Sequence, residues 1–306
     1  MLCGSSAGST GSPTRGPLMM VVHGLLLAIA CAAQGARGWV QIPGGRLVEQ
    51  DCILQIPNGA VVNVDEELAT KPRAGCSVKD KQVSEPQLQI YAADAHWQSQ
   101  EPIKNFTADW VVPPLPSRAD GQVVYFWPGL KSVRPEMGYP VIQPVMQFGE
   151  RSGGWELQSW FVDARSVWYP VVTAPPIKVN PGDKITSYIS LSHDGQTWTI
   201  SGRDVTTGQD STLNIKYSRA GKCDYHFAML VNENINVNTI CDLMPAADSV
   251  TFTGVEVDGQ RPSWTTRANC AGNPQCDCGN QAAVDDASGD VTLSWKTKAS
   301  GTEVVV

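Results

Sequence analysis

Two glutamines stand out as side chains whose spacing could support chemistry. Gln143 and Gln147 lie four residues apart within the run QPVMQFG. Because side-chain direction repeats every two residues along an extended strand, both amides are expected on one face. A buried amide without a hydrogen bond costs roughly 1–3 kcal/mol. The pair therefore indicates either two satisfied amides that brace a bulge at Pro144 or an amide directed at a substrate.

A single carboxylate, Glu233, is the second candidate. It lies between Asn232 and Asn234, directly after the apolar run FAMLV. Most glutamates at strand ends are surface residues, but a carboxylate held in a cleft can act as a general base. Only the fold can bring Glu233 and Gln147 together, since they are far apart in the chain.

The sequence lacks the motifs of other common catalytic sites. The sequence contains no G-x-S-x-G elbow, no Walker loop, no GxGxxG and no H-E-x-x-H. His96, His193 and His226 have no partner at metal-ligand spacing. We therefore expect neither a metal nor a cofactor, and any chemistry must come from carboxylates, amides and hydroxyls.

Composition and the N-terminal segment indicate which binding partners and which cellular location to expect. The 306 residues are 42% hydrophobic with 10 Trp, carry a net charge of -7 and have a pI of about 5.1. This acidic balance argues against a nucleic-acid partner. Residues 1–38 read as a signal peptide region, with Arg15 before the short apolar run LMMVVHGLLLAIACAA and small residues after it. We expect a secreted protein without further membrane contact; an uncleaved N-terminal anchor is the alternative.

The elements expected to position these residues are short strands. From residue 105 to 260, runs such as TADWVV, QVVYFW, WELQSWFV and TSYISL alternate with Pro, Gly and Asp turns. This pattern is typical of an all-β, antiparallel sandwich or barrel. Residues 39–104 read as an N-terminal lead-in or a pro-segment, and residues 261–306 as a Cys-rich extension with a mobile tail.

Seven cysteines follow the signal region and are expected to form disulfides in an exported chain. Proximity favours Cys52 with Cys76 and Cys223 with Cys241. A zinc site at Cys270, Cys276 and Cys278 is the alternative, but it lacks a fourth ligand nearby. Asn105 begins the chain's one glycosylation sequon.

The order of several motifs resembles that of the glutamic peptidases, or eqolisins. The motifs are Trp127-Pro128-Gly129, Met146-Gln147-Phe148-Gly149, the segment from Trp155 to Trp160, Pro181-Gly182-Asp183-Lys184-Ile185, Thr206-Thr207-Gly208-Gln209 and Ser249-Val250-Thr251-Phe252-Thr253. The resemblance spans residues 105–258 and implies a concanavalin A-like jelly roll. It also implies that Gln147 is the catalytic glutamine, with Gln143 as its competitor, and that Glu233 is the catalytic glutamate.

The resulting hypothesis is a secreted acid endopeptidase that acts on protein or peptide substrates. In that hypothesis five side chains line the substrate groove: Trp127, Gln143, Trp155, Gln158 and Trp160. The same tryptophans and amides would also suit a non-catalytic domain that binds a carbohydrate or cell-wall polysaccharide. A structural extracellular protein held by disulfides is the third possibility.

Overall fold

The computed structural model describes residues 39–45, 47–64, 78–79, 91–133, 140–149, 153–163, 171–218, 224–270 and 277–297. The predicted signal region and the last nine residues lie outside these ranges, as do Cys76, Cys223 and Cys276. Among the described residues, no helix has the length and apolar character needed to cross a membrane.

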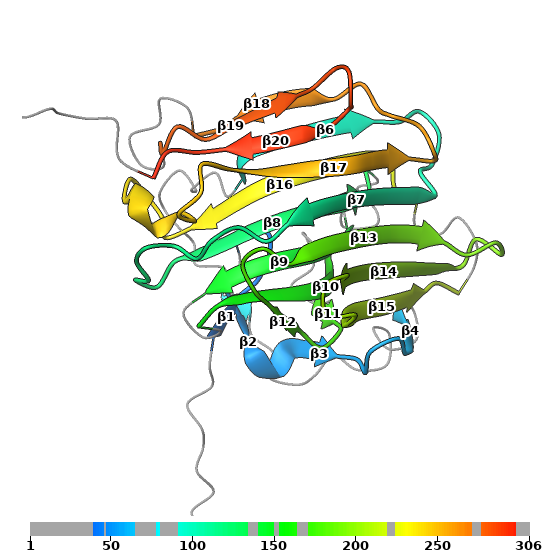
Figure 1. The fold of residues 1–306 in the computed structure, drawn as a ribbon. Coiled ribbons are helices and arrows are strands. Elements are labelled where there is room, and N and C mark those ends of the chain that lie inside the picture. The colour runs from blue at the N-terminus through cyan, green and yellow to red at the C-terminus, as the bar shows by residue number, and fades with distance from the viewer. Residues whose placement is uncertain are drawn as a thin grey trace, which may run out of the picture. The chain divides into compact units, whose positions relative to one another are not determined.

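Two large sheets form most of the described chain (Figure 1). The nine-stranded sheet contains, in spatial order, β18 (Thr265–Ala268), β6 (Tyr91–Gln98), β16 (Phe227–Ile235), β8 (Val123–Lys131), β9 (Pro140–Gly149), β10 (Trp155–Asp163), β11 (Val171–Thr173) and β3 (Ile53–Gln55), with β12 (Ile177–Val179) also paired to β10. The eight-stranded sheet contains β19 (Gln281–Val284), β20 (Val291–Ser294), β17 (Ser249–Val257), β7 (Asn105–Val111), β13 (Lys184–Leu191), β14 (Thr197–Asp204), β15 (Asp210–Lys216) and β4 (Val61–Asn63).

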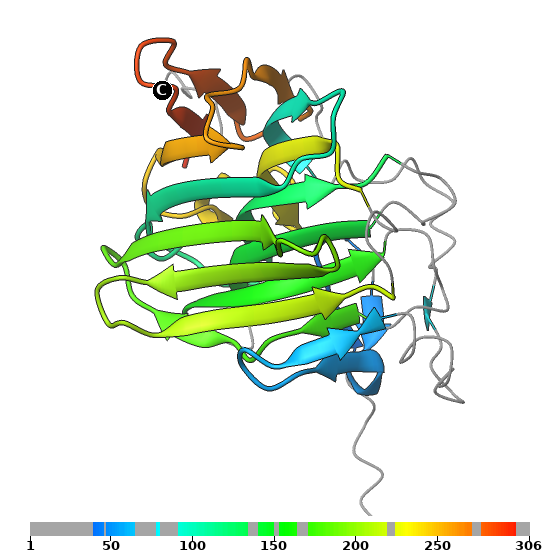
Figure 2. The same cartoon turned by 90° about the vertical axis from the view of Figure 1, so that its right-hand side faces the viewer.

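The two sheets pack face to face, as the two views of the ribbon show (Figure 2). Period-two alternation supplies the core: β7 buries Phe106, Ala108 and Trp110 and exposes the residues between them. The sheets approach so closely at β10 that Ser159 Oγ donates to the carbonyl oxygen of Ser211 over 2.6 Å. The predicted all-β antiparallel sandwich is confirmed.

The N-terminal and C-terminal segments are built into the same sheets. β3 and β4 pair in parallel with β11 and β15, whereas β18, β19 and β20 extend the opposite edges by antiparallel pairing. Figure 1 shows these additions in blue and in orange to red at opposite ends of the stack. β3 and β4 therefore help to complete the sandwich.

One disulfide differs from the proximity prediction. Cys241, in the short 3₁₀ helix η3 (Cys241–Leu243), bonds to Cys278, with a Cα–Cα distance of 5.4 Å. The predicted pair Cys223–Cys241 is therefore wrong. The reason is the pairing of β17 with β20, which brings the segment after Cys278 back beside the segment after Cys241. Cys52 and Cys270 are also disulfide-bonded.

A third, small sheet forms part of the cover over the nine-stranded sheet. It contains β1 (Trp39–Gln41), β2 (Leu47–Glu49) and β5 (Val78–Lys79), and η1 (Gln50–Cys52) follows β2. Ile42, Val48 and Cys52 join a second hydrophobic cluster with residues of β8, β9, β10 and β16. We call residues 40–45 and 47–52 the covering segment, and we call the face of the nine-stranded sheet beneath it the outer face.

Candidate functional site

A row of side chains crosses the outer face in register. Glu156 of β10 pairs with Gln147 of β9, Gln147 pairs with Tyr125 of β8, and Tyr125 pairs with Glu233 of β16. Cross-strand partners point to the same face of a sheet. Because neighbouring strands lie ~4.8 Å apart, the Cα atoms of Gln147 and Glu233 are about 10 Å apart. The fold therefore places the predicted amide and carboxylate on one face with a tyrosine between them.

Glu233 is fully buried, with 0% of its surface exposed. Trp127 donates its indole N–H to Oε2 over 3.2 Å, and Gly44 donates its main-chain N–H to Oε1 over 2.8 Å. Burial raises the pKa of Glu233 to about 8, against the opposing effect of these donors. The carboxyl group therefore holds its proton in the covered arrangement at acid pH.

The cover over Glu233 is a tight turn of the covering segment. Gly44 and Gly45 both have positive φ, at 91° and 74°, a conformation that glycine adopts without a steric penalty. On one side of the turn, Gln41 accepts a hydrogen bond from the Tyr125 hydroxyl over 3.0 Å. Beside it, Ile42 is fully buried in the second cluster. The turn thus combines apolar anchoring with main-chain contacts to two residues of the row.

A cavity of about 560 Å³ lies between the covering segment and the outer face. Seven of its lining residues carry amide side chains: Gln41, Gln50, Gln55, Gln122, Gln147, Gln158 and Asn236. Glu156 is the one charged side chain among the lining residues, and its Oε2 accepts a 3.3 Å hydrogen bond from Gln147 Nε2. Within the described ranges, no group of three or more His, Cys, Asp or Glu side chains could hold a metal ion.

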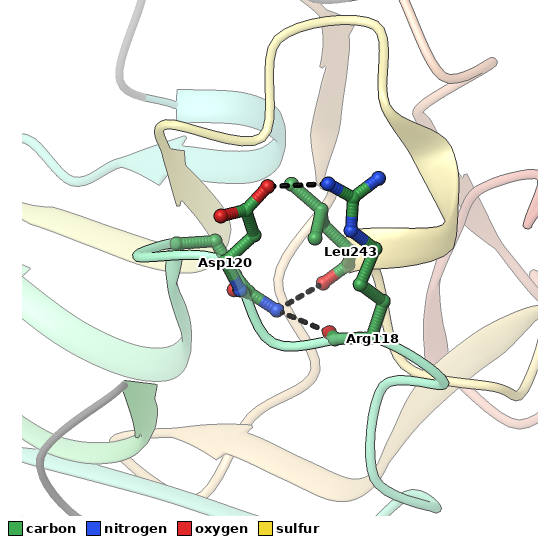
Figure 3. Close-up of polar contacts among 4 residues, drawn as sticks. Arg118, Asp120 and Leu243 are labelled. Atoms are coloured by element: carbon green, nitrogen blue, oxygen red, sulfur yellow. Dashed lines mark hydrogen bonds and ion pairs between the residues drawn. The ribbon is translucent and has the colours of Figure 1, made fainter.

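A buried glutamine fastens the rim of this cavity. Gln122 Nε2 donates to the carbonyl oxygens of Arg118 and Leu243, and its Oε1 accepts the N–H of Asp120. Figure 3 shows Arg118, Asp120 and Leu243 drawn together, with the Arg118 guanidinium paired to the Asp120 carboxylate. This network joins the loop before β8 to η3, which the Cys241–Cys278 disulfide also holds.

The predicted groove residues separate into two environments. Trp160 and Gln158 line the cavity, whereas Trp127 and Gln143 do not, and Trp127 contacts Glu233 instead. Trp155 instead lies in the core between the sheets and does not line the cavity, which corrects the expectation. Trp155 and Trp160 are five positions apart on one strand, and an odd separation places two side chains on opposite faces.

Gln143 shares the outer face with Gln147, as their spacing predicts, but it lies deeper and is 2% exposed. Its cross-strand partner is Trp160, which in turn pairs with Thr173. In the part of the chain that the structure describes, Gln143 Oε1, Trp160 Nε1 and Thr173 Oγ1 are buried without a hydrogen-bond partner. Such unpaired buried atoms are rare in folded proteins.

Sequence reasoning missed Tyr125, Glu156 and the Gly44–Gly45 turn. Strand alternation in the run QVVYFW could have indicated Tyr125. This residue is two positions from Trp127, so the two side chains share one face of the strand. No sequence signal links Gly44 to Glu233. Asn105 is exposed at the start of β7, so its side chain is accessible for the predicted glycosylation.

The chain resembles known proteins in structure and not in sequence. Neither a protein-family profile nor a curated protein matches the sequence. Solved structures do match. Scytalido-glutamic peptidase with a peptide-based transition state analogue is 16% identical, with 68% of this chain and 100% of that chain covered and a TM-score of 0.46. Eqolisins are therefore among the structural neighbours of this chain.

SCP-B, a member of the eqolisin family in complex with the tripeptide Ala-Ile-His, is 14% identical with the same coverage and a TM-score of 0.46. Aspergilloglutamic peptidase from Aspergillus niger is 18% identical, with 57% of this chain and 99% of that chain covered and a TM-score of 0.34. At TM-scores below 0.5 these likenesses do not decide function. The case for a function rests on the residues of the outer face.

Proposed function

We propose that this protein is a peptidase of the glutamic type, in which Glu233 and Gln147 act together on a peptide bond. The observation that carries the proposal is the common row on the outer face: strand register gives both side chains the same face, Gln147 lines the cavity, and Glu233 lies two strands away beneath Gly44. A carboxylate and a side-chain amide in this arrangement supply a proton acceptor and a fixed hydrogen-bond donor.

In the proposed reaction Glu233 takes a proton from water as the water oxygen attacks the scissile carbonyl carbon. The Gln147 amide N–H donates to the oxygen on which negative charge develops, a contribution of about 2.7–4 kcal/mol for one such donor. Glu233 then returns the proton to the leaving amine. An amide does not titrate in water, so the pH dependence of the step reports the carboxyl group.

The described arrangement is a covered form of the proposed enzyme. Glu233 is sealed by Gly44 and has a raised pKa, so it cannot accept a proton from water at acid pH while the covering segment is in place. Departure of that segment would admit water, and hydration would lower the pKa of Glu233. The strand β6 lies between β18 and β16 in the nine-stranded sheet, so residues 39–104 cannot leave as a whole without taking apart the site. We therefore restrict the proposed pro-segment to the covering segment, which closes the site in a protein that is secreted and matures at acid pH.

The experiment uses the full chain, secreted and then incubated at pH 2–5 with a denatured protein substrate. Mass spectrometry follows both the N-terminus of the chain and the peptides released. We expect Gln147→Ala to lower substrate cleavage about 10²–10³-fold, and Glu233→Gln to abolish it. Gln209→Ala and Glu101→Gln are matched controls, because both positions are exposed and distant in register from the row. Activity that survives both site substitutions would dismiss this pair.

A second candidate function is carbohydrate binding, and the lining of the cavity favours it. Seven amide side chains and the Trp160 ring are groups that bridge sugar hydroxyls and stack on sugar faces. Titration calorimetry of the full chain with cell-wall oligosaccharides tests this function. Saturable binding that Trp160→Ala weakens, with no hydrolysis of protein by the wild type, would favour it over the peptidase.

A further inference from the structure

Tyr125 occupies the centre of the row that contains Gln147 and Glu233. It is the register partner of both, so each lies one strand away, or about 5 Å between neighbouring Cα atoms. The ring is 1% exposed and is packed in the second cluster, and the residue also lines the cavity. The hydroxyl is therefore held in one position at the edge of the cavity.

The acceptor of this hydroxyl is a main-chain carbonyl. Tyr125 donates to the oxygen of Gln41 over 3.0 Å, while Gly44 of the same turn donates its N–H to Glu233. The covering segment thus presents to the outer face the two polar groups that every peptide bond carries. The carbonyl lies at Tyr125 and the N–H lies at the carboxylate.

We propose that Tyr125 is a further catalytic residue, whose hydroxyl binds the scissile carbonyl oxygen together with the Gln147 amide. In the covered form the Gln41 carbonyl stands in for the carbonyl of the substrate. The inference rests on the proposed peptidase function and adds a residue that the motif order did not indicate.

The hydroxyl is suited to this task because it stays protonated. Burial and the neighbouring Glu233 carboxylate raise the pKa of Tyr125 well above its usual value. A donor that is fixed by packing costs no reorganisation when charge develops on the carbonyl oxygen. Gln147 is less buried than Tyr125 and shares its amide between Glu156 and Gln158, so Tyr125 is the more rigid of the two donors.

The step balances with Tyr125 as a donor only. The water oxygen bonds to the carbonyl carbon and its proton passes to Glu233, while the π electron pair of the carbonyl moves to its oxygen. Tyr125 O–H and Gln147 N–H hold that oxyanion. Collapse reforms the carbonyl, breaks the C–N bond and passes the proton from Glu233 to the leaving nitrogen. Tyr125 keeps its proton throughout.

The test is Tyr125→Phe in the full chain, which keeps the ring and removes the hydroxyl. Tyr188→Phe is the matched control, because Tyr188 lies on the eight-stranded sheet and is 42% exposed. In the intact chain, hydrogen exchange of the amides in residues 41–45 should be about 2- to 10-fold faster for Tyr125→Phe, the effect of one lost neutral hydrogen bond. The control should match the wild type.

After acid processing, kcat on a protein substrate should fall about 10²-fold or more for Tyr125→Phe, with KM within about twofold of the wild type, because the donor acts on charge that develops in the transition state. An unchanged kcat in an active enzyme would overturn the role of Tyr125 and leave the Gln147–Glu233 pair standing. An inactive processed wild type would overturn the peptidase proposal and the role of Tyr125 with it. Unchanged exchange would overturn the stand-in role of Gln41.

Discussion

Gly44 donates its main-chain N–H to Glu233 Oε1 over 2.8 Å, although the two residues are 189 positions apart in the chain. The contact closes the carboxylate that strand β16 presents on the outer face. Trp127 donates its indole N–H to the other carboxylate oxygen, and the apolar side chain of Ile42 is buried in the second cluster with Trp127. The access of water to Glu233 therefore depends on a turn of the N-terminal segment.

Gly44→Pro should open this cover. Proline has no N–H to donate and fixes φ near -65°, whereas Gly44 has a φ of 91°. We expect faster hydrogen exchange across the covering segment and, on the proposed function, protein cleavage without prior removal of the segment. Exchange mass spectrometry at neutral pH and the cleavage assay check the two effects.

Gly59→Pro is the control for that substitution. Gly59 also has positive φ and donates its N–H to the carbonyl oxygen of Thr212, but this contact holds β4 and not the site. We expect it to destabilise the edge of the eight-stranded sheet without exposing Glu233. Equal exchange in the covering segment for the wild type and Gly44→Pro would show that the hydrogen bond does not hold the cover.

Glu233 should make the stability of the covered protein pH-dependent. Its pKa is raised from 4.5 to about 8 by burial, so the folded chain binds the proton more tightly than the unfolded chain. The contribution to stability is complete below about pH 4.5 and is lost as the pH rises through about 8. Each unit of pKa difference corresponds to ~1.4 kcal/mol. We therefore expect the free energy of unfolding to fall by on the order of a few kcal/mol over this pH range.

Urea unfolding of the wild type and Glu233→Gln at pH 5 and pH 8 measures this dependence. The glutamine variant keeps the shape of the side chain and cannot titrate. Its free energy of unfolding should therefore fall less between the two pH values than that of the wild type. Parallel pH profiles for the two proteins would contradict the buried, proton-holding carboxyl group.

Gly129→Ala should disturb Glu233 through Trp127. A Cβ atom at position 129 would lie 2.8 Å from Cζ3 of the Trp127 ring and 3.2 Å from Cβ of Gln143. The rigid, buried ring must move, which weakens its hydrogen bond to Glu233. Overpacking of this kind costs about 1–3 kcal/mol, measured as the free energy of unfolding. Gly154→Ala is the control, because a Cβ there meets nothing within 4 Å, and a loss as large in the control would refute the steric argument.

Gln122→Ala should loosen the rim of the cavity. The substitution leaves the Asp120 N–H and the Arg118 and Leu243 carbonyls without their side-chain partner. Buried polar groups left unpaired cost about 1–3 kcal/mol, so the free energy of unfolding should fall by that amount while Gln209→Ala has little effect. Limited proteolysis should cut first near residues 117–122. If Gln122→Ala resists proteolysis in that loop as well as the wild type does, the disulfide alone holds the rim.

Part of the site was accessible from the sequence because it depends on local periodicity. The four-residue spacing of Gln143 and Gln147 correctly predicts a shared face, and alternating runs with regular turns correctly predict an all-β sandwich. The same parity rule, applied to Trp155 and Trp160, would have separated the core tryptophan from the cavity tryptophan. These features require only the geometry of one strand.

The remaining features depend on contacts between distant segments, which no local pattern encodes. Strand order places β9, β8 and β16 side by side and so brings Gln147, Tyr125 and Glu233 into one row. The pairing of β17 with β20, and not proximity in the chain, selects Cys278 as the partner of Cys241. The sequence by itself determined which side chains share a face of a strand. Only the tertiary structure decided which strands are neighbours, and that a glycine turn closes the carboxylate, because burial and long-range hydrogen bonds arise only when the chain packs.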